Sequence, residues 1–450
     1  MTRDSGASTP RPPRPWSEPM EPAFLAFSPL NDSVFVLNLP QVKFGLGATR
    51  EVGYEAKRLG MREVILVVGR KMREGKTFEE VKSSLEGEGI RVHVVDRVRI
   101  EPEDTALMEA YREVKELRVD GFVALGGGST IDTAKVLNLL HTYPADLDDY
   151  LNKPIGKGLS PPGPLRPMIA IPTTAGTGSE NTSVAVLDVA RLRVKTGISN
   201  QYLRPSVALV DPLNTLSLPP MVTASSGLDV LNHALESYTA HPYTARPRIQ
   251  DPAQRPVYAG ATPISDVFAL EAIGWVHRYL RRAYADPYDL EARYYMMLGA
   301  SVAGIGFGHA GVHVPHAMAY PIAGMLRRWY PEDYEFGYPI APHGISTAIP
   351  AAYALRYLAP FAEERFSRVL QRLGVEPEEG RVGDQLFEYY MKLLTSLRVP
   401  TNLRELDFSL EDVDQLVQGT LAQQRLLGLS PKQVGRKDLE QIFKGAIEGG

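Results

Sequence analysis

The chain has 450 residues, 44% hydrophobic and 23% charged, which is enough for two compact domains with a sizeable core and excludes disorder of the whole chain. Its 49 Lys and Arg against 53 Asp and Glu give a formal net charge of −4, so we expect a small-molecule partner rather than nucleic acid or a membrane surface. With no Cys in the chain, disulfides, thiolate metal sites and a Cys nucleophile are excluded, and His, Asp and Glu remain as metal ligands.

Seven of the first 30 residues are Pro, among Ser, Thr and Arg, a composition that neither forms a helix nor buries much area. We therefore predict a flexible tail over residues 1–30. The chain has no run of 18 apolar residues and no apolar N-terminal region of the secretory type, which argues against a membrane span or export. The prolines also argue against the amphipathic helix of a transit peptide, so we expect a cytoplasmic protein.

Short apolar runs alternate with helical patterns from about residue 43 to residue 215. Each run is nearly continuous rather than alternating, as is typical of strands that are buried on both faces. The runs are 64–68, 92–95, 122–125, 168–171 and 207–210. They predict an α/β N-terminal Rossmann-like parallel-sheet domain over residues 31–218, with ligands bound at the carboxyl ends of the strands.

The strand at 122–125 runs into three glycines, after which Ser129 and Asp132 begin a helix. Glycines at such a turn let backbone N–H groups approach an anion at the helix N-terminus. A second polar loop, PTTAGTGSE at 172–180, follows the next strand at the same sheet edge. Together the two loops predict dinucleotide binding, although Thr173, Thr174 and Thr177 are equally suited to capping a helix.

After Pro219 and Pro220 the strand pattern ends, which predicts an all-α C-terminal domain over residues 219–450. Helical periodicity covers 225–239, 265–284, 290–304 and 409–426, and Ser409 with Asp412 resembles a capping box. The residues at 240–263 predict a loop punctuated by Pro. We expect the active site in the cleft between the two domains.

Asp229 and His233 are four residues apart, so they share one face of a predicted helix and can reach one ion. Their neighbours are apolar or small, and a buried carboxylate there is costly unless a cation compensates it. Four further His fall between residues 309 and 343, namely His309, His313, His316 and His343. One Asp with three His would form an N/O site for a divalent metal, but spacing alone does not choose among these four.

These motifs, in this order, resemble the iron-containing (group III) alcohol dehydrogenase family over roughly residues 40–445. They are GGGS at 126–129 with Asp132, PTTAGTGSE at 172–180, Asp229-xxx-His233-Ala-Leu-Glu, Pro-His-Ala-Met at 315–318 and Pro-His-Gly at 342–344. Segments outside these motifs are most similar to the hydroxyacid-oxoacid transhydrogenases of that family, at 129–138, 152–158, 233–240, 254–256, 263–266, 304–308 and 330–334. The resemblance implies a dehydroquinate synthase-like architecture, Fe²⁺ as the metal, NAD or NADP as the cofactor and a homodimer.

The resemblance also implies site residues. The metal ligands are expected to be Asp229, His233, His316 and His343. The N/O ligand set also accepts Zn²⁺, Mn²⁺ or Co²⁺. Dinucleotide contacts are implied for Gly127, Gly128, Ser129, Thr173, Thr174, Thr182 and Lys195, to which we add Asp132 and Thr177 from the two loops and Gly69 and Arg70 from the first strand end.

Two positions depart from the family pattern. Tyr320 stands where many members have a further His, so we expect Tyr320 or His313 to pass the proton. Gly69 stands where an Asp commonly binds the adenosine ribose. Without that carboxylate nothing repels a 2′-phosphate, and Arg70 and Lys71 follow, so we expect NADP to be used at least as well as NAD.

The expected function is metal-dependent hydride transfer between a nicotinamide cofactor and an alcohol or hydroxyacid. The loop at 240–263 carries Arg246, Arg248 and Arg255, whose guanidinium groups favour a carboxylate substrate similar to 4-hydroxybutyrate. A transhydrogenase that retains its cofactor is an alternative to a dehydrogenase that releases it. A lyase of the dehydroquinate synthase type would need Lys or Arg at the metal, and segments 226–235 and 311–320 have none. A nucleotide-sensing binding protein would need no metal ligands.

Overall fold

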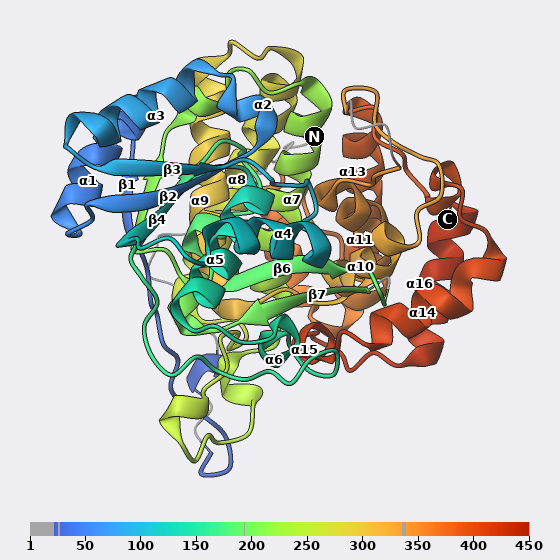
Figure 1. The fold of residues 1–450 in the computed structure, drawn as a ribbon. Coiled ribbons are helices and arrows are strands. Elements are labelled where there is room, and N and C mark those ends of the chain that lie inside the picture. Colours follow the sequence, from blue (N-terminus) through green and yellow to red (C-terminus); the bar gives the residue numbers. More distant parts are fainter. Residues whose placement is uncertain (1–21, 26–27, 193, 335–338, 450) are drawn as a thin grey trace, which may run out of the picture.

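The computed structural model describes residues 22–25, 28–192, 194–334 and 339–449. Its N-terminal half is a parallel sheet with helices on both faces, and its C-terminal half is helical, as predicted (Figure 1). Residues 1–21 of the predicted tail lie outside the described residues. Residues 22–25 form a short 3-10 helix, in which Phe24 is buried and stacks on Tyr243.

The main sheet has six parallel strands in the order β1-β8-β5-β4-β2-β3. They are β1 Gln41–Phe44, β2 Glu63–Val68, β3 Arg91–Val95, β4 Gly121–Gly126, β5 Met168–Pro172 and β8 Val207–Val210. All five apolar runs are therefore strands. Strand β1 was not predicted, because this edge strand is only partly buried and lacks a continuous apolar run.

Helices cover both faces of this sheet and make it the middle of three layers. Alternate strand residues face opposite layers: Val64 and Leu66 pack toward one set of helices, and Ile65 and Val67 toward the other. The helices of this half are α1 Val52–Arg58, α2 Arg70–Arg73, α3 Lys76–Gly87, α4 Asp104–Val114, α5 Gly128–Thr142 and α6 Leu147–Tyr150. Because both faces are covered, the strands show the continuous apolar runs of the sequence.

The register of β4 and β5 places the two polar loops side by side. Leu125 pairs with Ile171, and Gly126 pairs with Pro172, at the carboxyl ends of the two strands. The glycine turn and the threonine loop begin immediately after these pairs. The shared sheet edge predicted from the sequence is therefore present.

A separate antiparallel hairpin joins the two halves and was not predicted. It consists of β6 Val184–Val189 and β7 Val194–Ser199. β6 packs near α5 and β7 packs near α10, so the hairpin lies between the sheet domain and the helices (Figure 1). Its strands mix apolar residues with Asp188, Lys195 and Thr196, which hid them from a search for continuous apolar runs.

The C-terminal half contains helices of up to 23 residues. They are α7 Pro220–Thr239, α8 Pro263–Ala285, α9 Leu290–Ala310, α10 Val314–Gly324, α11 His343–Leu358, α12 Glu363–Arg372, α13 Val382–Ser396, α14 Val413–Leu421, α15 Gln424–Leu427 and α16 Arg436–Glu448. The first three predicted helices are present and extend beyond the predicted limits. The prediction of one helix over 409–426 was wrong: the capping box at Ser409 and Asp412 opens a 3-10 turn, and a break at Gln423 separates α14 from α15.

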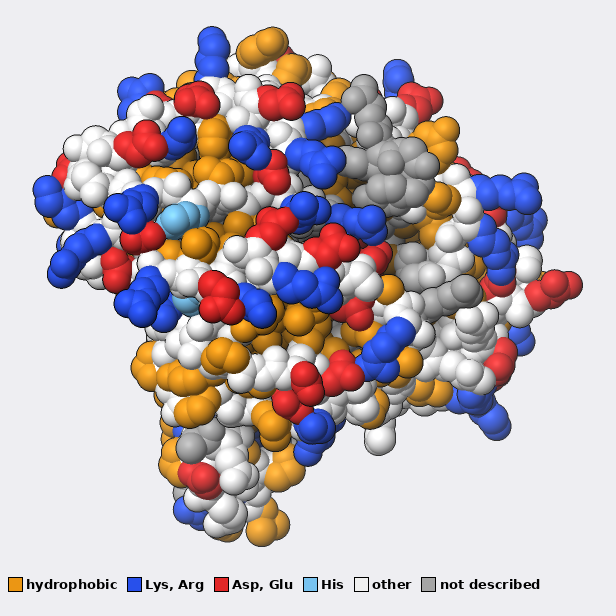
Figure 2. Space-filling model, in the orientation of Figure 1, with side chains coloured by type: hydrophobic (Ala, Val, Ile, Leu, Met, Phe, Trp, Pro, Cys, Tyr) orange, Lys and Arg blue, Asp and Glu red, His pale blue; other side chains and the backbone are white. Residues whose placement is uncertain are grey.

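The surface agrees with the low net charge. On the face in Figure 2, basic and acidic side chains are interspersed, and neither kind forms a continuous field. Among the described residues no single helix has the length and apolarity to cross a membrane, and α9 with α10 meets that test only as a pair bent by 103°.

Candidate active site

Helix α7 carries three of the polar side chains at the site. Asp229, His233 and Glu236 are spaced by four and three residues, so they share one face of the helix. All three are buried, at 4% exposure or less. The residues around them, such as Leu228 and Leu231, belong to the helical core. A polar stripe of this kind is stable only if other groups compensate its charge.

The other two His lie at the beginnings of later helices. His316 is in the first turn of α10, and His343 is the first residue of α11. The start of α11 approaches α7 so closely that a Cβ on Gly344 would lie 1.8 Å from the carbonyl oxygen of Ser225. This approach requires a glycine, and it places His343 beside Asp229.

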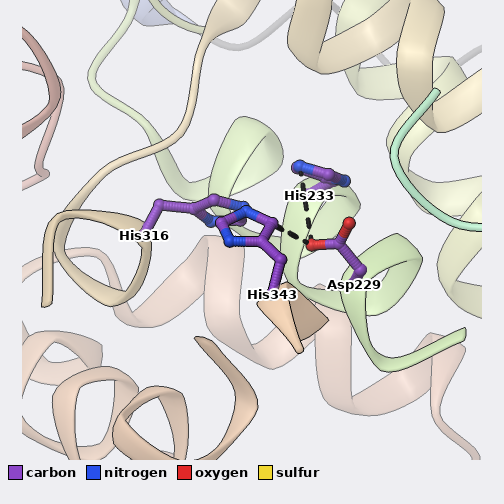
Figure 3. Close-up of side chains that lie close together, drawn as sticks. All are labelled: Asp229, His233, His316 and His343. Atoms are coloured by element: carbon purple, nitrogen blue, oxygen red, sulfur yellow. Dashed lines mark ion pairs between the residues drawn. The ribbon is translucent and has the colours of Figure 1, made fainter. Parts of the chain in front are cut away.

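Asp229, His233, His316 and His343 point toward one another (Figure 3). Their ligand atoms all lie within 4.8 Å of one another. Oδ1 of Asp229 is 3.7 Å from Nε2 of His233, 3.7 Å from Nε2 of His316 and 3.8 Å from Nε2 of His343. These distances are too long for hydrogen bonds. They are near the roughly 3.4 Å that separates ligand atoms placed about 2.1 Å from a tetrahedral metal ion.

The chemistry of the cluster fits a divalent metal. Oδ1 of Asp229, Nδ1 of His233 and Nε2 of His316 are buried atoms without a hydrogen-bond partner among the described residues. Burial raises the pKa of Asp229, and burial together with the charge of His316 holds the pKa of His233 well below its usual value. The negative charge of Asp229 is therefore costly, which a bound cation would relieve, and the ring of His233 stays neutral, which is the form that ligates a metal. One carboxylate oxygen with three imidazole nitrogens suits Fe²⁺ and its transition-metal neighbours.

Glu236 orients His316 and was missed as a site residue. Its Oε1 lies 2.6 Å from Nδ1 of His316, and its Oε2 accepts a hydrogen bond from the backbone N–H of His313 at 2.8 Å. Burial lowers the pKa of His316, but the charges of Glu236 and Asp229 outweigh it and raise that pKa to about 9. With Nδ1 engaged, Nε2 is the nitrogen left for a metal. The available signal was spacing, since Glu236 is seven residues after Asp229 on one helix face.

A cavity of about 110 Å³ has residues of both halves of the chain in its wall. The active-site cleft was predicted at this place. Its helical side includes His233, His316, His343 and Tyr320. Its other side includes Gly128 and Ser129 at the start of α5, together with Lys195 of the hairpin. Phe307 closes the wall behind His233, with the two rings stacked and their centroids 3.8 Å apart. The metal cluster and the glycine turn therefore open into one space.

The two polar loops pack directly on each other. The backbone N–H of Thr173 donates to the carbonyl of Gly126 at 3.0 Å. A Cβ on Gly128 would lie 2.5 Å from Cγ2 of Thr177, so this position also requires a glycine. The N-terminus of α5 consequently lies at the cavity, and backbone N–H groups at a helix N-terminus are an arrangement that binds phosphate.

A buried network under the loops ties them to the hairpin. Nζ of Lys135 donates to Ser179, Thr182 and the carbonyl of Val184 at 2.8 to 2.9 Å. Asp132 accepts hydrogen bonds from Ser179 and from the backbone of Val186. Burial lowers the pKa of Lys135 to about 8. Lys135 was not predicted as a site residue. Its position three residues after Asp132 could have indicated that the two side chains lie on one face of the helix.

The structure divides the predicted cofactor residues into two groups. The cavity wall contains Gly128, Ser129, Asp132, Thr177, Thr182 and Lys195. Outside the wall, at the ends of β2, β4 and β5, lie Gly69, Arg70, Gly127, Thr173 and Thr174. The strand register places these ends next to one another. A ligand that extends from the cavity along the sheet edge would pass the second group.

The two predicted proton-relay residues differ in position. Tyr320 lines the cavity, and its ring centroid is 6.4 Å from that of His343. His313 is absent from the wall, and its Nε2 lies 2.9 Å from the hydroxyl of Thr239. Burial lowers the pKa of His313 to about 4, so this ring is neutral at physiological pH. His309 is outside the cluster as well, where its ring contacts the carbonyls of Ile305 and Asn38.

The arginines of the loop at 240–263 are not at the cavity. Arg246 and Arg255 both form ion pairs with Asp32, at 2.6 and 3.2 Å. Arg248 is exposed and contacts the backbone of residues 29 and 30. These contacts fasten the extended N-terminal segment to the loop at the bottom of Figure 1. The interpretation of these arginines as substrate ligands is therefore replaced by a structural role.

The chain is similar to known proteins along nearly its whole length. It is 42% identical over 422 residues to the mitochondrial hydroxyacid-oxoacid transhydrogenase of Bos taurus, covering 93% of this chain and 91% of that protein. Among solved structures, 1,3-propanediol oxidoreductase superposes with a TM-score of 0.79 and 27% identity, over 92% of this chain and all (100%) of the other. Sulfoacetaldehyde reductase from Bifidobacterium kashiwanohense, solved with NAD⁺, has a TM-score of 0.76 and 25% identity over 93% of this chain and 100% of the other.

These relatives correct the expected location. The transhydrogenases that match over 92 to 93% of the chain are named mitochondrial, so the expectation of a cytoplasmic protein was wrong. The expectation rested on the missing apolar N-terminal region and on prolines that disfavour the amphipathic helix of a transit peptide. An apolar region is required for secretion, whereas mitochondrial targeting segments are rich in Arg and Ser and need none.

Two family models match consecutive parts of the chain. The one described as iron-containing alcohol dehydrogenase matches residues 40–212, and the one described as the C-terminal part of the same family matches residues 257–447. The first contains the glycine turn and the threonine loop, and the second contains His316 and His343. The chain is thus an oxidoreductase that belongs to the iron-containing alcohol dehydrogenase family.

Proposed function

We propose that this protein transfers a hydride from a hydroxyacid to an oxoacid through a nicotinamide cofactor that it retains, with Fe²⁺ held by Asp229, His233, His316 and His343. The observation that carries the proposal is the common cavity, in whose wall the three His of the cluster lie together with the glycine turn at Gly128 and Ser129. The transhydrogenase relatives supply the hydroxyacid and the oxoacid as the substrate pair.

The helical side and the sheet side of the cavity have different roles. Asp229, His233, His316 and His343 would hold a divalent cation that supplies Lewis-acid chemistry at the substrate hydroxyl, and the sheet side would hold a nicotinamide that supplies the hydride acceptor and donor. Gly128 and Ser129 hold the cofactor phosphates with backbone N–H groups. Phe307, Val312 and Leu426 line the wall and exclude water from the reacting carbon. Asp229 and the three imidazoles orient the substrate oxygen against the sheet side of the cavity.

Tyr320 holds a proton rather than releasing one. Burial raises the pKa of its hydroxyl well above its usual value of 10. The phenol is therefore neutral at physiological pH and can donate a hydrogen bond to the substrate oxygen or to a water between them. We propose this role for Tyr320 in place of the His that other family members have at this position.

The lyase and nucleotide-sensor alternatives are not supported by the cavity. A phosphate leaving group needs several cations, but the Lys and Arg in the wall are Lys195, which forms an ion pair with Glu101, and Arg425. A nucleotide sensor needs no metal site, so it does not account for four clustered side chains that could ligate a metal.

Isotope exchange without added nicotinamide tests the proposal. Dialysed protein is mixed with 4-hydroxybutyrate deuterated at C4 and with unlabelled 4-oxobutyrate, and deuterium in the recovered aldehyde is measured. We expect exchange, together with nicotinamide released on acid denaturation. Exchange that requires added NAD⁺ would instead assign an ordinary dehydrogenase, and no exchange under either condition would reject the hydroxyacid reaction.

A further inference from the structure

Arg425 lines the cavity, but it belongs neither to the metal cluster nor to the glycine turn. It lies on α15, the short helix that follows the break at Gln423, and α15 packs against α10, the helix of His316 and Tyr320. Its guanidinium lies over the ring of Tyr258, with Cζ 4.8 Å from the ring centroid. Arg425, Tyr258, Tyr320 and Leu426 all line the cavity, and the ring centroid of Tyr320 is 6.4 Å from that of His343 in the metal cluster.

Within the described ranges, no carboxylate forms an ion pair with Arg425. Nη1 is buried and has no hydrogen-bond partner in the described part of the chain. The other charged side chains of the wall are already engaged: Lys195 pairs with Glu101, and Asp132 accepts from Ser179 and Val186. Tyr258 is a neutral partner, because burial raises the pKa of its hydroxyl. Arg425 as a whole is partly buried, but a guanidinium nitrogen that is buried without an acceptor is costly, and an anionic ligand would remove that cost.

We propose that Arg425 binds the carboxylate of the substrate, whose hydroxyl lies at the cluster of Asp229, His233, His316 and His343. The inference rests on the proposed function and gives its substrate class. Arg425 forms no ion pair with Asp229, whereas all three His lie within 3.8 Å of that residue. The carboxylate and the hydroxyl would therefore occupy separate places in one cavity of about 110 Å³, which suits a small hydroxyacid with these two groups at opposite ends of a short chain.

The position of Arg425 favours a substrate over a cofactor phosphate. Phosphates are bound by the backbone at the N-terminus of α5, which needs no guanidinium. Arg425 instead lies among aromatic and aliphatic side chains on the side of α10. A planar fork over an aromatic ring is a rigid and selective partner for a carboxylate.

Substrate pairs that differ in the carboxylate alone test the proposal. Arg425→Gln removes the charge and keeps most of the side chain, and Arg425→Lys keeps the charge and loses the fork. With the hydride acceptor saturating, we expect Arg425→Gln to raise KM for 4-hydroxybutyrate about 10- to 100-fold. The value of kcat/KM for 1-butanol should change by less than about threefold. Arg425→Lys should recover part of the loss.

A second readout is independent of turnover. Butyrate, which lacks the hydroxyl, should inhibit the wild type competitively, and its inhibition constant should rise about 10- to 100-fold in Arg425→Gln. Butyramide, its neutral analogue, should inhibit both proteins equally. Arg436→Gln is the matched control, because this exposed arginine of α16 pairs with Asp414 away from the cavity.

The outcomes distinguish failure of the role proposed for Arg425 from failure of the proposed function. Equal losses for 4-hydroxybutyrate and butanol, an unchanged butyrate constant, or a weakened affinity for the nicotinamide alone would overturn the role of Arg425. Equal turnover of 4-hydroxybutyrate and 2-hydroxybutyrate would overturn the separated arrangement. Each of these results leaves the proposed function intact. A wild type with no metal-dependent turnover of either hydroxyacid or alcohol would overturn the proposed function itself.

Discussion

The sheet side and the helical side of the cavity offer different groups to a ligand. On the sheet side these are backbone N–H groups at the start of α5, where Gly128 lacks the side chain that would collide with Thr177. On the helical side they are buried side chains, one Asp and three His, brought together from α7, α10 and α11. A backbone site depends on close packing, whereas a side-chain site depends on charge compensation. Substitutions should therefore disturb the two sides in different ways.

Loss of the anionic ligand should have the largest effect. In Asp229→Asn the cluster keeps its shape but loses its only carboxylate, so Lewis-acid stabilisation of several kcal/mol is lost and kcat falls about 1000-fold or more. His343→Ala should behave similarly. Steady-state kinetics and metal analysis after dialysis measure both. Asp211→Asn, a buried Asp that caps a 3-10 turn outside the cavity, is the control for burial alone. Near wild-type kcat in metal-depleted Asp229→Asn would contradict the metal site.

Glu236→Gln should have the next largest effect. The amide no longer orients and polarises the ring of His316 through Nδ1, so we expect metal affinity to fall about 10- to 100-fold. Metal-free protein titrated with Fe²⁺ measures the affinity, and activity should return at high Fe²⁺. Glu55→Gln, another buried carboxylate that pairs with Lys43 and Arg58 in the sheet half, should leave the affinity unchanged. Equal affinities in wild type and Glu236→Gln would assign this residue to packing.

Gly128→Ala should disturb the sheet side without affecting the metal. The new Cβ lies 2.5 Å from Thr177, so the loops must separate and cofactor affinity should fall about tenfold. Thr177→Gly in the same chain should restore much of that affinity. Gly87→Ala, where nothing lies within 4 Å of the new Cβ, serves as the control. Equilibrium binding of NAD⁺ and Fe²⁺ is measured side by side, and a joint loss of both would contradict the division between the two sides.

Gly69→Asp should have the smallest effect. A Cβ at Gly69 meets no atom within 4 Å, so an Asp fits at the end of β2. Its carboxylate would bind the ribose hydroxyls of NAD and repel the 2′-phosphate of NADP, and we expect the NADP to NAD affinity ratio to fall about tenfold. The wild type should bind NADP at least as well as NAD. A tenfold NAD preference in the wild type, unchanged in Arg70→Ala, would show that this strand end does not discriminate.

The sequence predicted the sheet side better than the helical side, for a physical reason. Strands buried on both faces are continuous apolar runs, and the glycine turn follows one of them directly, so neighbouring residues carry the whole signal. The edge strand β1 and the hairpin β6–β7 are only partly apolar, and that signal was absent. The capping box at Ser409 was readable because it is also local.

On the helical side the local signals ended at the pair Asp229 and His233. The partners arrive through contacts between helices, such as the approach of Gly344 to Ser225, which spacing does not encode. Spacing alone did not distinguish His309, His313, His316 and His343 as metal ligands. The resemblance to the family selected His316 and His343. Arg425 was hidden for the same reason: it reaches the cavity because the helix breaks at Gln423, whereas the periodicity of 409–426 predicted a continuous helix.

If hydride transfer in the common cavity requires one metal ion, the rate of exchange must follow the amount of bound metal. Metal-free protein is titrated anaerobically with Fe²⁺, and deuterium exchange between 4-hydroxybutyrate and 4-oxobutyrate is followed in the same samples. We predict that the exchange rate rises in proportion to bound Fe²⁺ and saturates at one ion per chain in the wild type, and that Asp229→Asn shows no such rise. Full exchange by metal-free protein, or saturation of the rate before the site fills, would contradict the account.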